Sequence, residues 1–343
     1  MLHVFSGFMV SIFFVLLTTP SLAVSQPAAC GSPFFNDLAQ YLGLSEHQTR
    51  LEQGDVVHTA LLTDEQLPEE IVAVGAMLLV RGVAPRTVIN GFMADETFRK
   101  VHEVERYQAL SESEQEAFTF GQLTVEPESD LARAFRNPGR NFNLSLLESA
   151  NLKAVNVKGK QGVLGAEQVW RNILENRLES FIGSGVRGIK PYFDSHGKEV
   201  SPAKELTSAI ESFSFLENQF PLFVGGLLAP SSAPEPEFDQ QYFWLETEFD
   251  NQNLWALSSE LRLLQKESAL ASDLHFYASR GYFSMLTIIG VVPYCDHSLA
   301  FAVNHTYTDA VLGFAAGFKR RVGRKRVAEA LSLHLETVRL QLE

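Results

Sequence analysis

An uncharged stretch late in the chain, "GYFSMLTIIGVVPY" from Gly281 to Tyr294, limits the possible folds more than any other segment. Only fifteen uncharged residues separate Arg280 from Asp296, and a glycine and a proline interrupt them. A membrane-spanning helix needs about 20 apolar residues, and Thr, Ile and Val favour strands. We therefore expect a long strand that is buried on both faces, or that faces a cavity on one.

The segments after this stretch predict a second strand and a terminal helix. "SLAFAVNHTYTD" (residues 298–309) follows the short turn "YCDH" and predicts an antiparallel partner. From about Thr308 to the end, apolar residues recur at helical spacing. They form two apolar stripes, and the helical spacing is broken between the stripes, beside Gly323. This break predicts a bend or a change of packing partner. The stripes are Val311, Phe314, Ala315, Phe318 and Val322, then Val327, Leu331, Leu335, Val338 and Leu342.

The first half of the chain predicts a mixture of strands and helices. Helices are expected at 33–44 and from about Pro85, and strands at 54–62, 71–82 and 118–127. Two more strands are expected at 241–249 and 253–265, although the second also fits a helix. Between the strands of the first part and these last two strands, helices are expected from about 144 to 220. Ser145 and Glu148 have the spacing of a capping box at their start. A proline-rich connector follows at 229–237.

This order predicts an α+β fold in which a curved antiparallel sheet packs on a long C-terminal helix. The expected organisation is an N-terminal part of the core (24–143), a helical insertion (144–228), and C-terminal strands and helix that complete the core (229–343). Residues 1–23 read as a signal peptide, with the apolar run Met9–Leu17 before Ser21 and Ala23, so we expect a periplasmic or secreted protein. An uncleaved anchor, or a lipid on Cys30, is the alternative.

Charge, cysteines and motifs exclude several functional classes. The net charge of −13 opposes nucleic-acid binding. The zinc-protease, nucleotide-binding and nucleophile-elbow motifs do not occur, so we expect no cofactor and no metal, and no motif names a reaction. Ser201 with Lys204, and Asp296 with His297, are weak catalytic pairs. Cys30 and Cys295 form either one long-range disulfide or two independent thiols.

Two segments resemble a known architecture. "VAVGAMLLVRGVAPRTVINGFMAD" resembles the strand-then-helix opening of START-like proteins, also called helix-grip or Bet-v-1-like folds. "FYASRGYFSMLTIIG" with "LAFAVNHTYTDAVLGFAAGFKRRVGRKR" is similar to the closing strands and terminal helix of an uncharacterised exported bacterial family. The resemblance covers about 50–125 and 240–343 and leaves the helical block unexplained. It implies a curved sheet closed by a helix over an elongated apolar cavity for a lipid or another hydrophobic molecule.

Six residues are predicted to line this cavity: Tyr277, Arg280, Tyr282, Asn304, Phe314 and Phe318. If the strand alternates regularly, Arg280 and Tyr282 point away from Tyr277. Arginine can hold a carboxylate or phosphate head group through paired hydrogen bonds, whereas a surface position or a structural ion pair is the alternative.

A basic cluster, "KRRVGRKR", holds Lys319, Arg320, Arg321, Arg324, Lys325 and Arg326. It predicts docking on an anionic membrane surface, with pairing to local acids as the alternative. The expected function is therefore non-catalytic binding of a hydrophobic or amphipathic small molecule. An enzyme that uses the same cavity would show perturbed polar groups converging inside it, and an envelope structural protein would show a solidly packed interior.

Overall fold

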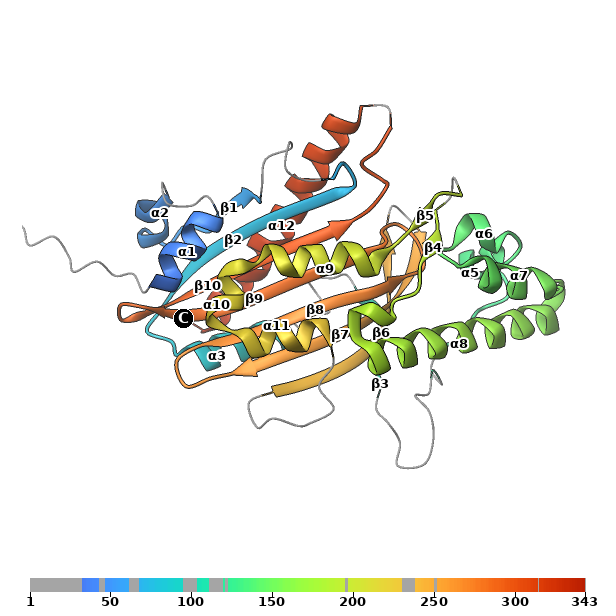
Figure 1. Cartoon of the computed structure of the whole chain (residues 1–343), viewed down its shortest axis with the longest axis horizontal. Helices are drawn as coiled ribbons and strands as arrows, with labels where there is room; N and C mark the ends of the chain where they lie inside the picture. Colours follow the sequence, from blue (N-terminus) through green and yellow to red (C-terminus); the bar gives the residue numbers. More distant parts are fainter. Residues whose placement is uncertain are drawn as a thin grey trace, which may run out of the picture. The chain divides into compact units, whose positions relative to one another are not determined.

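A single antiparallel sheet organises the chain, and its described residues form eight strands (Figure 1). The order across the sheet is β1, β2, β10, β9, β8, β7, β6, β3. The strands are β1 Val57–Ala60, β2 Ile71–Arg81, β3 Val104–Leu110, β6 Phe238–Phe249, β7 Gln252–Leu264, β8 Ala269–Ala278, β9 Ser284–Tyr294 and β10 His297–Tyr307. With the C-terminal helix α12 (Ala316–Leu342), this sheet confirms the coarse prediction of an α+β fold.

The computed structural model describes residues 33–42, 47–61, 68–94, 104–110, 120, 123–194, 197–229, 238–249, 252–313 and 315–342. Gly31–Glu343 form one compact unit. The predicted signal peptide, Cys30, Phe314 and residues 230–237 of the connector lie outside the described residues. None of the helices in the described ranges combines the length and the hydrophobicity that crossing a bilayer requires.

The uncharged stretch forms β9, and its pairing with β10 is the one predicted. The register runs without interruption from Ser284 opposite Tyr307 to Tyr294 opposite His297. Residues 286–292 of β9 are all buried, so both faces of this strand are covered. The connecting turn contains Cys295, whose φ of 55° is left-handed.

The inner face of the sheet, as we call the face that packs against α3 (Pro85–Phe92) and α12, holds the main apolar core. The helices contribute residues that include Phe92, Leu331 and Leu335, which are at most 7% exposed. The strands contribute valines and many alanines. The inward alanines are Ala76, Ala269, Ala271, Ala300 and Ala302. Small side chains at these positions allow the two helices to approach the strands closely.

The outer face of the sheet is covered by a helical block that we call the insertion; it begins with α5 at Asp130, ahead of the predicted bounds of 144–228 (Figure 1). Its aromatic side chains pack on those of the strands, as when Phe181 stacks on Phe276 with ring centroids 4.1 Å apart. The elements are α5 Asp130–Ala134, α6 Pro138–Asn141, α7 Leu146–Ala154, α8 Gly159–Ser184, the 3₁₀ turn η2 Gly185–Gly188, the hairpin β4 Tyr192–Phe193 and β5 Glu199–Val200, α9 Pro202–Ser212, α10 Ser214–Gln219 and α11 Pro221–Leu228. Two N-terminal helices, α1 Pro33–Tyr41 and α2 Gln48–Glu52, complete the described elements.

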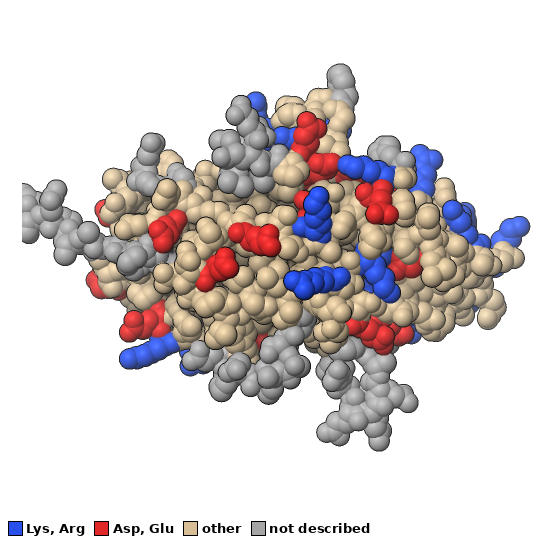
Figure 2. Space-filling model, viewed as in Figure 1, with Lys and Arg blue, Asp and Glu red and all other residues tan. Residues whose placement is uncertain are grey.

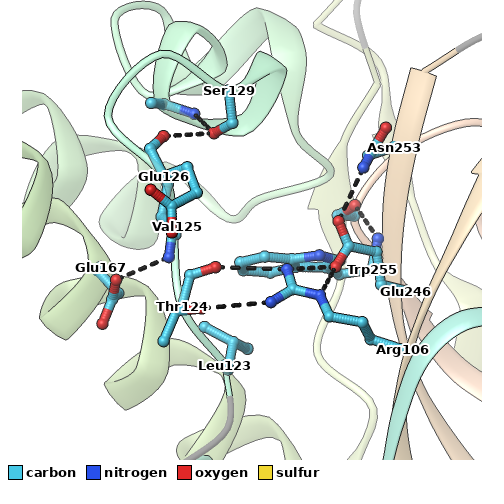
Figure 3. A network of polar contacts seen from close by, with 12 residues as sticks. Arg106, Leu123, Thr124, Val125, Glu126, Ser129, Glu167, Glu246, Asn253 and Trp255 are labelled. Atoms are coloured by element: carbon cyan, nitrogen blue, oxygen red, sulfur yellow. Dashed lines mark hydrogen bonds and ion pairs between the residues drawn. The ribbon is translucent and has the colours of Figure 1, made fainter.

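A polar network ties the segment before the insertion to the sheet (Figure 3). Glu246 of β6 is 4% exposed and accepts hydrogen bonds from Arg106 Nε at 2.5 Å and from Asn253 Nδ2 at 2.8 Å. Arg106 also donates to Thr124, and the next amide, that of Val125, donates to Glu167 of α8 at 2.8 Å. Because each buried charge has a partner of opposite charge or several donors, we assign this network to folding.

The prediction of a strand at 118–127 is wrong for residues 123–127, which pair with no strand. The alternating burial of Leu123 and Val125 arises from packing beneath α8, to which the Val125 amide is bonded. The actual strand of this region is β3, Val104–Leu110, which pairs with β6. The helix reading of residues 253–265 is also excluded, since β7 pairs with strands on both sides.

The terminal helix begins at Ala316 and not at Thr308 as predicted. Thr308 is held at the sheet end, where its amide donates to the Glu70 carbonyl and its hydroxyl to the Gly281 carbonyl, both at 2.8 Å. Left-handed φ angles at Gly313 (78°) and Ala315 (60°) then redirect the chain. The second predicted stripe lies inward, because Leu331, Leu335 and Val338 are buried. Of the first stripe, Val311 is buried in the same core ahead of the helix, whereas Phe318 is 67% exposed.

Candidate functional site

The register of four central strands places polar side chains in two rows across the inner face. In the first row, Glu260 of β7 lies opposite Asp273 of β8, Asp273 opposite Thr287 of β9, and Thr287 opposite Asn304 of β10. Residues directly opposite one another share a face of the sheet. These four side chains therefore form a continuous polar line, and each residue is at most 6% exposed.

The second row starts with Ser258 of β7 opposite His275 of β8, and continues with Met285 and Thr306. Tyr282, from the connection after β8, reaches His275 from the same side. We call the following seven residues the inner polar site: Ser258, Glu260, Asp273, His275, Tyr282, Thr287 and Asn304. All of them are at most 6% exposed, whereas the next inward positions toward α3 are apolar on β8, β9 and β10, at Ala271, Ile289 and Ala302, and carry Arg262 on β7.

A chain of hydrogen bonds links four members of the inner polar site. His275 Nδ1 lies 2.5 Å from the Tyr282 hydroxyl, and His275 Nε2 lies 3.0 Å from Asp273 Oδ2. Ser258 donates to the other carboxylate oxygen of Asp273. With a neutral imidazole, Tyr282 donates to Nδ1 and the Nε2 proton is donated to Asp273. Burial, reinforced by the charge of Asp273, raises the pKa of Tyr282 and keeps its hydroxyl protonated.

Glu260 titrates close to neutral pH within the same site. Burial raises the pKa of its carboxyl to about 7, although Arg262 opposes this shift. The Arg262 Nη2 atom lies 3.0 Å from Glu260 Oε2, but its side chain is 24% exposed, so solvent weakens its attraction. The charge of Asp273 adds a further upward shift. Glu260 can therefore either donate or accept a proton at physiological pH.

The end of the first row toward β10 consists of uncharged hydrogen-bonding groups. Asn304 Nδ2 donates to Thr287 Oγ1 at 2.9 Å, and Thr306 Oγ1 donates to Asn304 Oδ1 at 2.9 Å. The predicted binding residue Asn304 thus lies on the inner face and next to the charged part of the row. Chemically, the row offers a carboxyl pair at one side and an amide with hydroxyls at the other.

The six predicted cavity residues do not share one surface. Tyr282 and Asn304 belong to the inner polar site, but Tyr277 and Arg280 lie on the outer side, which corrects the prediction for this pair. The Arg177 guanidinium of α8 lies 4.3 Å from the Tyr277 ring centroid, and that of Arg280 lies 5.3 Å from the Phe142 ring centroid. A register shift between β7 and β8 and the end of β8 at Ala278 break the alternation assumed from the sequence. Of the two phenylalanines, Phe318 is exposed and Phe314 lies outside the described residues.

The other predicted pairs and the basic cluster lie near the surface. Ser201 and Lys204 stand at the start of α9. Asp296 Oδ1 and His297 Nε2 are 3.4 Å apart in the β9–β10 turn, with the Asp296 side chain 84% exposed. Cys295 lies in this turn and is disulfide-bonded, which excludes the alternative of two independent thiols; Cys30 lies outside the described residues. In the basic cluster, Arg320 is buried, Arg324 is half-buried, and Lys319, Arg321, Lys325 and Arg326 are exposed.

Two hollows lined by described residues lie away from the inner polar site. An open hollow of about 390 Å³ lies between Gly54–Val56 and α12 residues that include Ser332 and Arg339. A space of about 10 Å³, enough for one water molecule, lies beneath α9 beside His305. Burial without a charged partner lowers the pKa of His305 to about 4, so its ring stays neutral. The described residues contain no group of three or more side chains that could hold a metal ion.

Sequence reasoning missed five members of the inner polar site: Ser258, Glu260, Asp273, His275 and Thr287. A signal for them does exist in the sequence. Ser258 with Glu260, and Asp273 with His275, stand at alternate positions of otherwise apolar strands, which places each pair on one face. Their convergence depends on the β7–β8 register, which the local pattern does not provide.

Comparisons with known proteins place the chain in no family. A scan against protein-family models gave no match, and a search of curated proteins gave none either. A search of solved structures found similarity to the "di-domain ARO/CYC StfQ from the steffimycin biosynthetic pathway", at 12% identity and a TM-score of 0.23. The match covers 52% of this chain and 57% of that chain. A likeness at this level carries no functional argument, so function has to be argued from the inner polar site.

Proposed function

We propose that the chain has a START-like core and binds an amphipathic small molecule on the inner face of its sheet. The connectivity supports this fold. β2 and α3 come first along the core, the other core strands follow, and α12 then packs on the inner face, as α3 does. The sheet order, with β2 beside the last strand β10, brings the first and last core strands together. β1 and the helices α5 to α11 are additions to this core.

The observation that carries the binding proposal is the inner polar site. Burying seven polar or ionisable residues on a sheet face that is largely apolar opposes folding, because each group loses water. Replacing such a network by apolar side chains of similar volume is often neutral or stabilising. Selection for the fold alone therefore gives no reason to keep it. A polar group of a ligand, held by the Glu260–Asn304 row, gives such a reason.

The export signal fits this proposal, since a carrier of amphipathic molecules acts where those molecules cross an aqueous compartment. We propose a periplasmic or secreted location after cleavage behind Ala23. Mass spectrometry of the mature chain tests this location. An intact residue Met1 would overturn it.

Native mass spectrometry of protein from its own envelope fraction, followed by organic extraction, tests the binding proposal. We expect one discrete bound mass that extracts as an amphipathic compound. Thr287→Val removes a single buried hydroxyl from the row and should lower the bound fraction. Ser272→Ala removes a buried hydroxyl from the outer-facing side of β8 and serves as the matched control. An apo mass together with no uptake of a fluorescent fatty acid would overturn the proposal.

A second candidate function is acid–base catalysis, and the Tyr282–His275–Asp273–Ser258 chain favours it. A hydroxyl held by an imidazole, which is itself oriented by a carboxylate, can pass a proton to or from a bound molecule. Masses extracted from the wild type and from His275→Gln distinguish the two functions. An enzyme would hold different compounds in the two proteins, because the variant stops before proton transfer. A non-catalytic binder would hold the same compound in both.

A further inference from the structure

The first half of α12 presents an apolar ridge flanked by cations on its solvent side. At 3.6 residues per turn, Phe318 and Val322 stand one above the other on the side opposite buried Arg320 and Leu331. Lys319 and Arg326 flank this ridge on one side, and Arg321 and Lys325 flank it on the other. We call these six residues the basic ridge: Phe318, Lys319, Arg321, Val322, Lys325 and Arg326.

The basic ridge is open to solvent. Phe318 is 67% exposed, Lys319, Arg321, Lys325 and Arg326 are all exposed, and Val322 is half-buried. In Figure 1, the first turns of α12 stand clear of the sheet at the top of the view. A phenylalanine in this position contributes little to the core. A single exposed apolar side chain is ordinary, so the distinctive feature is the combination of Phe318 and Val322 with four cations on one side of the helix.

Pairing with local acids accounts for little of this charge. The sequence has no acidic residue from 310 to 328. Lys325 approaches Glu329 at 3.6 Å with both side chains more than 60% exposed, which is a weak solvent-screened pair. Within the described part of the chain, Arg321 and Arg326 form no ion pair. On the insertion side of the molecule, by contrast, acidic and basic side chains are interspersed (Figure 2).

The dipole of α12 also opposes the placement of these cations near its N-terminus. The N-terminus of a helix carries a partial positive charge, so cations in its first turns are unfavourable. The first turn of α12 holds no acid, and Lys319 follows three residues after its start. Concentrating cations at this end raises the local positive potential at a cost in helix stability. Binding of an anionic surface offsets that cost.

We infer that the basic ridge docks the protein on an anionic phospholipid membrane. Phe318 and Val322 would enter the boundary between head groups and acyl chains, and the four cations would contact lipid phosphates. This combination of an apolar line with flanking basic residues is the chemistry of interfacial helices. With a net charge of −13, the rest of the surface is repelled by the same membrane, which fixes the orientation. The inference does not depend on the inner polar site.

Vesicle flotation with the full chain tests the inference. Vesicles containing phosphatidylglycerol should bind the protein, and vesicles of phosphatidylcholine alone should not. Replacing Lys319, Arg321, Lys325 and Arg326 by Gln should weaken binding by roughly 600-fold, because each basic residue near an anionic surface contributes about a fivefold factor. A control variant with the same charge change, in which Lys158, Lys160, Arg187 and Lys190 are replaced by Gln, should bind like the wild type. All four control residues are exposed on the insertion.

A second variant separates a membrane from other anionic partners. Phe318→Ser should weaken vesicle binding by about tenfold, through loss of the inserted ring, and should leave binding to soluble heparin unchanged. Failure of the wild type to bind anionic vesicles would overturn the inference. So would equal vesicle binding by the wild type and the four-residue variant. Equal vesicle binding by Phe318→Ser would assign the ridge to a soluble anionic partner and would also overturn it.

Discussion

Replacing Glu260 by Gln should stabilise the protein much more at pH 8 than at pH 5. Burial raises the pKa of this carboxyl from 4.5 to about 7, so the folded chain holds the proton more tightly than the unfolded chain does. Below about pH 4.5 the carboxyl is protonated in both states and imposes no penalty. As pH rises toward 7, the unfolded state ionises first, and stability falls. Above that pH the full penalty remains.

The size of the effect follows from the gap between the two pKa values. A shift from 4.5 to about 7 corresponds to about 3 kcal/mol of destabilisation at high pH. The groups that act on Glu260 are Arg262 on the same strand, Asp273 on β8 and Asp239 on β6. Glutamine keeps the shape and still accepts a hydrogen bond from Arg262, but it has no charge to desolvate. The gain at pH 8 should therefore approach, without exceeding, about 3 kcal/mol.

Urea unfolding at pH 5 and pH 8, followed by tryptophan fluorescence, measures both differences. Glu246→Gln is a useful control, because this buried carboxylate is held by Arg106 and Asn253 and its replacement should destabilise. The reasoning fails if Glu260→Gln changes the free energy of unfolding equally at both pH values. It fails also if the variant is less stable than the wild type at pH 8.

Three further substitutions test the packing of the sheet by urea unfolding. Arg177→Met should lower the free energy of unfolding by about 3 to 5 kcal/mol, because it leaves Glu148 without its partner at 2.6 Å. Adding Glu148→Met should recover part of this loss. A loss below about 1 kcal/mol would contradict a stabilising role for the Arg177–Glu148 ion pair. Gly290→Ala should cost about 1 to 3 kcal/mol, since its new Cβ would lie 2.1 Å from the ring of the fully buried Phe301, and a neutral result would show that the ring can move. Ser145→Ala should cost about 1 kcal/mol through loss of the capping box, and no change would contradict this.

Elements with a strong local pattern were predictable from the sequence. The paired strands β9 and β10 are the predicted ones, because an uncharged β-branched run followed by a short turn has few other solutions. The capping box of Ser145 and Glu148 is present as predicted, since it depends only on residues three positions apart. The second apolar stripe of α12 is also correct, because a helix buries every third or fourth residue.

Features that depend on long-range contacts could not be predicted in this way. The segment around Leu123 and Val125 alternates like a strand, but no neighbouring strand is available to it and α8 takes its place. The start of α12 is set by the bonds that hold Thr308 at the sheet end. The inner polar site needs the pairing of Glu260 with Asp273, and a shift of one residue would turn one of them outward.

The distribution of large rings between the two faces bears on where function lies. The chain has 26 phenylalanines, and large apolar rings can either fill a core or line a binding cavity. Trp170 and Phe181 of α8 pack with Tyr277 and Phe276 of β8, so these rings hold the insertion on the outer face.

The inner face carries alanines and the inner polar site among its valines and leucines. Buried ionisable side chains occur on the outer face too, at Glu246 of β6 and His305 of β10, but on the inner face Glu260, Asp273 and His275 gather on two adjacent strands. The insertion therefore serves to cover the outer face, and its aromatic contacts are structural. A ligand, if it binds this sheet, meets the face that holds Glu260, His275 and Asn304.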